Sequence, residues 1–160
     1  MHSQLRAVLS DNEEMAVAEK KLIYAALGSV PDSKLKLATL EWALHQVKLQ
    51  DFFYPMLSVQ NSGAAGSDIA WQFCQDNIHV VADKLASASP SLLNAVISCT
   101  ARGTATFERA DEVEAFFKSD AVAPRMEKIT TKIAQMLENM RNDAKFLEQL
   151  AELETGFFKV

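Results

Sequence analysis

Apolar residues recur every three or four positions along almost the whole chain, and this spacing is typical of amphipathic α-helices. No alternating pattern of strand length interrupts it. Gly28 stands where a left-handed glycine commonly ends a helix. Before it, from residue 13 to Leu27, we expect a helix whose apolar stripe consists of Met15, Ala18, Leu22 and Ala26. The pattern predicts an all-α protein.

A second helix is predicted from Lys34 to Lys48, with Asp32 or Ser33 as its N-cap. It carries apolar residues on two opposite faces, because at about 100° per residue the two sets lie about 180° apart. One set is Leu37, Leu40, Leu44 and Val47, and the other is Leu35, Ala38 and Trp42. Such a helix has to be covered on both sides, as an inner helix of a stacked array is.

Further helices are predicted downstream, each opened by a capping residue or by proline. Their starts are Asp51 for a short aromatic helix, Ser67 or Asp68 after a glycine loop, Ser89 with Pro90, Thr106 or Ala110 for residues 111–117, and Pro124 for the longest helix.

Helices joined by short turns form either a bundle or a right-handed α-α solenoid, and the two-sided second helix favours the solenoid. No strict repeat period is visible, and no low-complexity linker divides the chain. We therefore predict one domain over residues 1–160, a HEAT- or armadillo-like array of stacked antiparallel helix pairs with about seven to eight helices. Residues 1–4 are set apart as a segment that need not belong to the natural domain.

The glycine loop at residues 61–67, NSGAAGS, raises the question of phosphate binding. A phosphate loop needs a preceding strand and the pattern GxxxxGK[ST] or GxGxxG, because successive backbone N–H groups must converge on the anion. Here the preceding segment is helical, no lysine follows, and Gly63 and Gly66 fit neither pattern. We interpret the loop as a helix–helix turn with left-handed glycines.

The composition excludes several function classes. With 49% hydrophobic and 23% charged residues and a net charge of −5, the 160 residues suit a globular protein that folds without disulfide or metal support. No basic stripe with interleaved aromatics indicates nucleic-acid binding, and no apolar run indicates a membrane span. The polar N-terminus is unlike a signal peptide. Cys74 and Cys99 are expected to be buried and reduced, in a cytoplasmic protein.

The most specific pattern is QD followed further along by GxxxAWxFxxxN. It resembles the C-terminal helical domain of zinc-dependent aminopeptidases of the puromycin-sensitive and endoplasmic-reticulum type. The matching residues are Gln50, Asp51, Gly66, Ala70, Trp71, Phe73 and Asn77. The resemblance spans residues 5–150 and includes the stretches EKKLIYAALGS, LEWAL, FF and LENMRNDAKFLEQ. Ser67 replaces an arginine usual in that family, which puts in doubt any partner contact that the arginine makes, and Ile78 replaces a tryptophan.

The resemblance implies that the chain is the non-catalytic C-terminal part of a larger aminopeptidase. Such enzymes bind Zn²⁺ through HExxH and a downstream glutamate and hold the substrate amine with a GAMEN loop, and neither motif occurs here. Zinc would therefore belong to the parent, and the partners would be its catalytic domain and peptide substrates. The domain would close over the catalytic domain and help to select peptides. Its motif residues Gln50, Asp51, Gly66, Trp71, Phe73 and Asn77 would be structural.

The residues themselves offer no catalytic, metal or cofactor site. The histidines are His2, His45 and His79, and no two are four positions apart. Glu41 and His45 share a helix face, but one pair does not make a zinc site. Cys74 and His79 would point about 140° apart on a helix, which is a poor arrangement for a nucleophile and its base.

Trp42 and Trp71 are expected in the core, and the Asn77 amide is expected to bridge to a neighbouring helix or loop, because an unpaired buried amide costs about 1–3 kcal/mol. Whether Phe157 and Phe158 pack on the array or fray is left open.

Three functions remain open: the C-terminal part of a zinc aminopeptidase, a stand-alone helical-repeat scaffold that binds a protein through its concave face, and a small enzyme. The absent motifs disfavour the enzyme. An upstream reading frame containing HExxH would exclude the scaffold.

Overall fold

The computed structural model describes residues 1–11, 15–85 and 89–157. Within these ranges every regular element is helical and no strand occurs, which confirms the all-α prediction. The elements are α1 (His2–Asp11), α2 (Val17–Gly28), α3 (Ser33–Gln46), the 3₁₀ turn η1 (Leu49–Asp51), α4 (Phe53–Gln60), α5 (Ala64–Leu85), α6 (Pro90–Ala101), α7 (Phe107–Lys118), the 3₁₀ segment η2 (Ala123–Ile129) and α8 (Thr130–Phe157).

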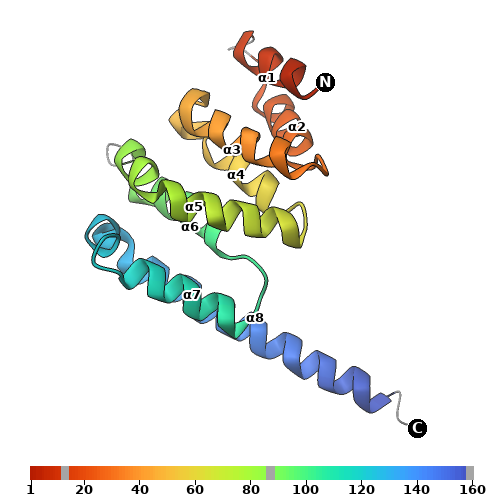
Figure 1. Cartoon of the computed structure of the whole chain (residues 1–160), viewed down its shortest axis with the longest axis vertical. Coiled ribbons are helices and arrows are strands. Elements are labelled where there is room, and N and C mark those ends of the chain that lie inside the picture. Colours follow the sequence, from red (N-terminus) through yellow and green to blue (C-terminus); the bar gives the residue numbers. More distant parts are fainter. Residues whose placement is uncertain (12–14, 86–88, 158–160) are drawn as a thin grey trace.

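The helices stack in chain order from α1 at one end to the α7–α8 pair at the other (Figure 1). From α3 onward, consecutive α-helices run in alternating directions. The helices α2, α4, α6 and α8 each contact the next member of this set, and we call the set the even row; α3 and α5 pack beside it. One hydrophobic core runs through the stack from Tyr24 on α2 to Met140 on α8.

Burial of α3 on two sides explains how the stack continues past it. Leu40 and Leu44 are buried on one face and Trp42 on the other, as predicted, and Phe73 of α5 is buried too. Leu37 does not follow the prediction, because it remains 42% exposed.

Three of the predicted caps are present. The Asp32 carboxylate accepts hydrogen bonds from the backbone N–H groups of Lys34 and Leu35, at 2.8 and 3.1 Å. The hydroxyls of Ser89 and Thr106 cap α6 and α7 in the same way. Each satisfies backbone donors that the first turn of a helix leaves unpaired.

Three predicted helix starts are wrong. Asp51 ends η1 and caps nothing, because α4 begins after Phe52 without a side-chain cap. Ser67 and Asp68 lie inside α5, which begins at Ala64. Pro124 lies in the 3₁₀ segment η2, whose dihedrals its fixed φ allows, and α8 begins only at Thr130.

The predicted stripe of the first long helix is also wrong. Leu22 is 71% exposed, whereas Tyr24 and Leu27 are buried. The ring of Tyr24 stacks on that of Tyr54, with 6.1 Å between centroids and 9° between planes. An aromatic side chain buries far more area than the alanines of the predicted stripe, so it decides which face of α2 turns inward.

Helix α1 was not expected from the sequence. Its His2, for which no role is predicted, lies with Nε2 2.9 Å from the Thr39 hydroxyl of α3. Residues 2–4 therefore form part of the first turn of a helix that contacts the array.

Two glycines allow close helix approach at one junction. A Cβ on Gly28 would lie 2.4 Å from the carbonyl carbon of Ser58, and one on Gly66 would lie 2.2 Å from the Val59 carbonyl oxygen. Neither glycine has a positive φ, so Gly28 is no left-handed cap. Both positions instead require glycine, because backbone atoms of α4 occupy the space that a side chain would fill.

The buried ammonium of Lys36 completes this junction. Lys36 is 3% exposed, and its Nζ donates to the Gly28 carbonyl at 2.9 Å and to the Ser62 hydroxyl at 2.6 Å. Burial lowers the pKa of this ammonium. We call the group Gly28, Lys36, Ser58, Ser62 and Gly66 the Lys36 junction; it ties together α2, α3, α4 and α5.

The glycine loop forms a helix–helix turn, as predicted, but only one of its glycines is left-handed. Gly63 has φ +98°, and no atom would crowd a Cβ there. Gly66 is helical and serves the Lys36 junction.

The two glycines should therefore respond differently to substitution. We expect Gly66→Ala and Gly66→Asn each to lower the free energy of unfolding by about 1–3 kcal/mol, through overlap with backbone. Gly63→Ala should cost about 1–2 kcal/mol through backbone strain, and Gly63→Asn less, because asparagine tolerates the left-handed region. Urea unfolding checks this. A harmless Gly66→Ala, or rescue by asparagine at position 66, would contradict the assignment.

Charged side chains hold α7 against α8. Arg141 Nη2 donates to the Asp111 carboxylate at 2.8 Å and to that of Glu114, and Lys118 Nζ lies 2.6 Å from Glu114 Oε1. Hydrogen bonds from Lys118 and Arg141 lower the pKa of Glu114 from 4.5 to about 2.

This cluster should make the α7–α8 contact sensitive to acid. The contribution of ionised Glu114 is fully present above its unfolded pKa, near 4.5, and is lost as the pH falls toward about 2. The difference in unfolding free energy between the unmodified chain and Glu114→Gln should therefore shrink over this window. Denaturant unfolding at several pH values tests it, with Glu138→Gln, an exposed position on α8, as control. A difference that stays constant down to pH 2 would be the opposite result.

Candidate functional site: a groove along the even row

Two adjoining pockets lie across the even row, and we call the pair the even-row groove. The first, of about 350 Å³, lies between α2 and α4, and the second, of about 450 Å³, lies among α4, α6 and α8. Leu57 and Asn61 line both, so the two pockets are adjacent at α4. The other principal lining residues are Lys21, Tyr24, Ser29, Phe53, Tyr54, Gln60, Ser98, Arg102 and Asp143.

Aromatic and aliphatic side chains of α4 supply the apolar part of this even-row groove. The rings of Phe53 and Tyr54 lie 4.3 Å apart, and Tyr54 stacks on Tyr24 of α2. Leu57 lies between the two pockets and is half-buried. The stacking follows from the Lys36 junction, since close approach of α2 to α4 brings these rings together.

Polar groups accompany the apolar strip. Asn61, Gln60 and Ser98 offer amide and hydroxyl groups that can both donate and accept hydrogen bonds. Lys21 Nζ lies 5.0 Å from the centroid of the Tyr54 ring. At the other end Arg102 Nη2 lies 3.6 Å from Asp143 Oδ2, and both side chains are more than half exposed, so this pair is weak.

A network between α5 and α7 fixes the Arg102 end of the groove. Gly103 is left-handed, with φ +48°, and a Cβ there would lie 3.0 Å from Arg109 Nη1. Arg109 pairs with Asp68 and, at 3.4 Å, with Glu112. Glu112 in turn accepts a hydrogen bond of 2.7 Å from the Trp71 indole. The turn after α6 therefore packs against Arg109, whose side chain pairs with residues of α5 and α7.

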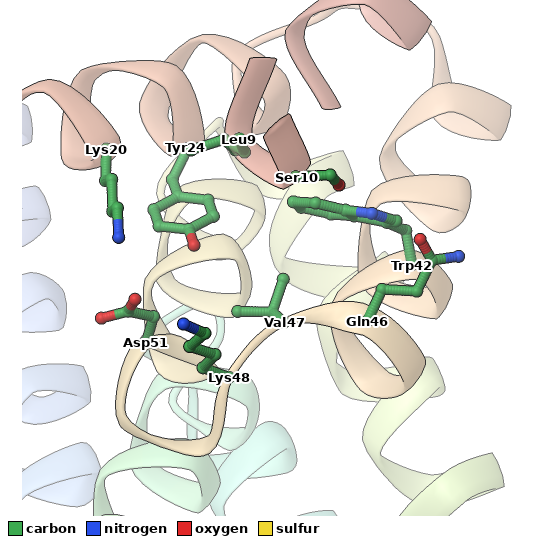
Figure 2. Close-up of a pocket in the computed structure, with 9 residues that line it drawn as sticks. All are labelled: Leu9, Ser10, Lys20, Tyr24, Trp42, Gln46, Val47, Lys48 and Asp51. Carbon is green, nitrogen blue, oxygen red and sulfur yellow. The ribbon is translucent and has the colours of Figure 1, made fainter. Parts of the chain in front are cut away.

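A further pocket of about 200 Å³ lies near the N-terminal end of the stack (Figure 2). Lys20 and Lys48 reach toward the Asp51 carboxylate, beside the ring of Tyr24, and Trp42 and Val47 supply an apolar wall. Burial and then the charge of Asp51 raise the pKa of Tyr24 to about 12. Asp51 thus faces two lysines here instead of capping α4, and the pocket is smaller than either part of the groove.

The motif residues predicted from sequence do not form one site. Gln50 is exposed and Asp51 lines the small pocket, whereas Gly66, Trp71 and Phe73 are buried at separate places in the stack. Among the described residues, Asn77 does not make the predicted bridge to a neighbouring element. Its amide donates to the Phe73 carbonyl of its own helix at 3.0 Å, since an asparagine side chain can reach the carbonyl four residues earlier.

The cysteines and histidines form no reactive pair in the described residues. Cys74 and Cys99 are free and buried, as predicted, and burial raises the pKa of both thiols, that of Cys74 to about 11. His79 is exposed while Cys74 is buried, so the two cannot act as base and nucleophile. Among residues 1–11, 15–85 and 89–157, no group of three or more His, Cys, Asp or Glu side chains could hold a metal ion.

Sequence reasoning did not find the groove residues. Tyr24 lies on α2, Leu57 on α4 and Arg102 directly after α6, and none of them stands out within its own segment. The aromatic run at residues 52–54 is the available signal, and the sequence analysis used it only to predict a short aromatic helix. No helix in the described part is long and apolar enough to cross a membrane.

Comparison with known proteins agrees with the resemblance seen in the sequence. The chain matches the family described as the ERAP1-like C-terminal domain over residues 3–142. It is 26% identical over 142 residues to an alanine/arginine aminopeptidase of Saccharomyces cerevisiae and 28% identical over 133 residues to aminopeptidase M1 of Arabidopsis thaliana. These matches cover 88% and 82% of the chain but only 16% and 14% of the relatives. The chain therefore belongs to the family of ERAP1-like C-terminal domains.

Proposed function

We propose that this chain is the non-catalytic C-terminal domain of a zinc aminopeptidase, and that its even-row groove holds part of the peptide while a distant zinc site cleaves the N-terminal residue. The observation that carries the proposal is a pair of adjacent pockets of mixed polarity in a domain of this family. The whole protein's activity is inferred from the names of its relatives, since the chain spans about one seventh of their length.

The chemistry of the groove suits a peptide. An extended peptide presents backbone donors and acceptors along its length and side chains at alternating sides. Asn61, Gln60 and Ser98 can pair with the backbone, and Tyr54 and Leu57 can accept apolar side chains. Few of these groups are charged, so the groove would tolerate many sequences and respond mainly to peptide length.

In this proposal the zinc ligands and the general base belong to the rest of the parent protein. The 160 residues contain no HExxH motif, and the described part contains no metal-binding cluster. In this proposal the domain closes over the catalytic domain, and peptide contacts in the groove favour the closed state. A peptide can shift that equilibrium only by its differential affinity for the two states, so long peptides shift it more than short ones.

The isolated chain should have no aminopeptidase activity. We expect no hydrolysis of aminoacyl reporters above a mock preparation and no stoichiometric zinc, because neither a ligand set nor a general base is present in the sequence. Elemental analysis and a fluorogenic assay check both statements. One tightly held zinc per chain, or turnover by the purified chain, would overturn the non-catalytic assignment.

Filling the groove in the full-length parent should separate long substrates from short ones. Asn61 lies on both pockets and is exposed, so Asn61→Trp adds bulk without disturbing the core. We expect kcat/KM for long peptides to fall about tenfold, which corresponds to about 1.4 kcal/mol, while a single-residue reporter keeps its kcat/KM.

Asn139→Trp, an exposed position on α8 that does not line the groove, is the matched control. Equal losses for long and short substrates would show that Asn61→Trp damages the fold or the docking of the domain. Unchanged kinetics for peptides of every length would show that the groove does not hold substrate.

A further inference from the structure

Three hydrogen bonds in series connect helix α1 to α3. Arg6 Nη2 lies 3.1 Å from Nδ1 of the His2 ring, and Nε2 of the same ring lies 2.9 Å from the Thr39 hydroxyl oxygen. Thr39 Oγ1 in turn donates to the Leu35 carbonyl at 2.9 Å. The His2 ring therefore joins a side chain of its own helix to a buried side chain of α3.

The donors and acceptors in this series require a neutral His2 ring. A guanidinium has only donors, so the bond from Arg6 needs Nδ1 to be an acceptor without a proton. The hydroxyl proton of Thr39 is given to the Leu35 carbonyl, so Thr39 Oγ1 accepts from Nε2–H of the ring. A second proton, on Nδ1, would turn that acceptor into a donor and place a second cation 3.1 Å from the Arg6 guanidinium.

The surroundings of His2 also oppose its protonation. Burial of the ring, followed by the positive charges of Arg6 and of the N-terminal amino group, lowers the pKa of His2 from its ordinary value of 6.5, while the Leu35 backbone acts in the opposite direction. On α3, the negative charge of Glu41 acts on the Arg6 guanidinium. The cation that faces the His2 ring is therefore itself held toward α3.

The other end of α1 lies at the small pocket. Leu9 and Ser10 line this pocket, together with Lys20, the charged residue that α2 contributes there (Figure 2). Between the two ends of α1, the guanidinium carbon of Arg6 lies 5.7 Å from the centroid of the Trp42 ring, which forms an apolar wall of the same pocket. A cation over an indole ring is attracted to it, so displacement of Arg6 would weaken the contact of α1 with the pocket as well as with α3.

We propose that His2 is a pH-sensitive switch for α1: the helix lies against α3 while the ring is neutral, and mild acid releases it and removes the part of the small pocket that Leu9 and Ser10 form. The pKa of His2 is lower when α1 is docked than when it is released. Docking is therefore fully stable above about pH 6.5 and weakens as the pH falls below that value. The switch does not depend on the peptide groove proposed above.

Hydrogen exchange of the α1 backbone amides in the 160-residue chain, measured by NMR at about pH 7.5 and about pH 5.5 and corrected for intrinsic exchange rates, tests the switch. We expect the protection of residues 5–11 to fall roughly threefold or more at the lower pH. His2→Gln carries an amide that does not titrate, so its protection should be the same at both pH values. His79→Gln makes the same change at an exposed histidine of α5 and should keep the pH dependence.

The titration of the His2 ring itself is the second measurement, and it remains decisive if His2→Gln releases α1 at every pH. We expect the NMR signals of the ring in the unmodified chain to change with a midpoint below pH 6.5. A midpoint at or above that value would contradict the proposal.

Three exchange results would also overturn it. The α1 amides could be unprotected at both pH values, which would show that the helix is not docked. Their protection could be equal at both pH values in the unmodified chain, which would show that protonation of His2 does not release the helix. The loss of protection in acid could persist in His2→Gln or vanish in His79→Gln, and either result would assign it to a different group.

Discussion

The contact on which this array depends is the crossing of α2 and α4 over Ser58, closed by the buried ammonium of Lys36. Gly28 provides the space, since a Cβ there would lie 2.4 Å from backbone. Lys36 Nζ then donates to the Gly28 carbonyl at the end of α2 and to the Ser62 hydroxyl in the turn after α4. A buried ammonium is costly unless it is hydrogen-bonded, so its partners must stay in place. The order of α2, α3, α4 and α5 follows from this one junction.

The groove is a consequence of the same junction. Close approach of α2 to α4 stacks Tyr24 on Tyr54, and this stack leads to Leu57 and Asn61, where the second pocket begins. The Arg102 end of the groove is held in a different way. Gly103 packs against Arg109, and Arg109 pairs with Asp68 of α5 and Glu112 of α7. A wall that holds peptide, as we propose for this groove, needs no reactive group. Its contribution is a fixed shape at a distance from the chemistry, which is what a non-catalytic domain of an aminopeptidase would supply.

Much of the fold could be predicted from local signals in the sequence. The helical period, the Asp32, Ser89 and Thr106 caps and the two-sided burial of α3 each depend on residues within one segment. The incorrect predictions concern features that depend on contacts between residues far apart in the sequence. The inward face of α2 is set by Tyr54, and the role of Gly66 is set by the backbone of α4. The motif residues were recognised as a pattern, but their contacts, such as Trp71 with Glu112, join helices that the sequence alone does not place together.

The central claim is that peptide lies in the even-row groove of the parent enzyme, and photo-crosslinking tests it most directly. A long peptide carrying a benzoylphenylalanine at its C-terminal part would be irradiated with the intact parent, and the adducts located by mass spectrometry. The account predicts adducts on the two segments that line the groove, residues 53–61 in and directly after α4 and residues 95–105 in and after the last part of α6. It also predicts that an unlabelled long peptide, but not a single-residue reporter, competes them away. Adducts confined to other parts of the parent, with none on these two segments, would contradict it.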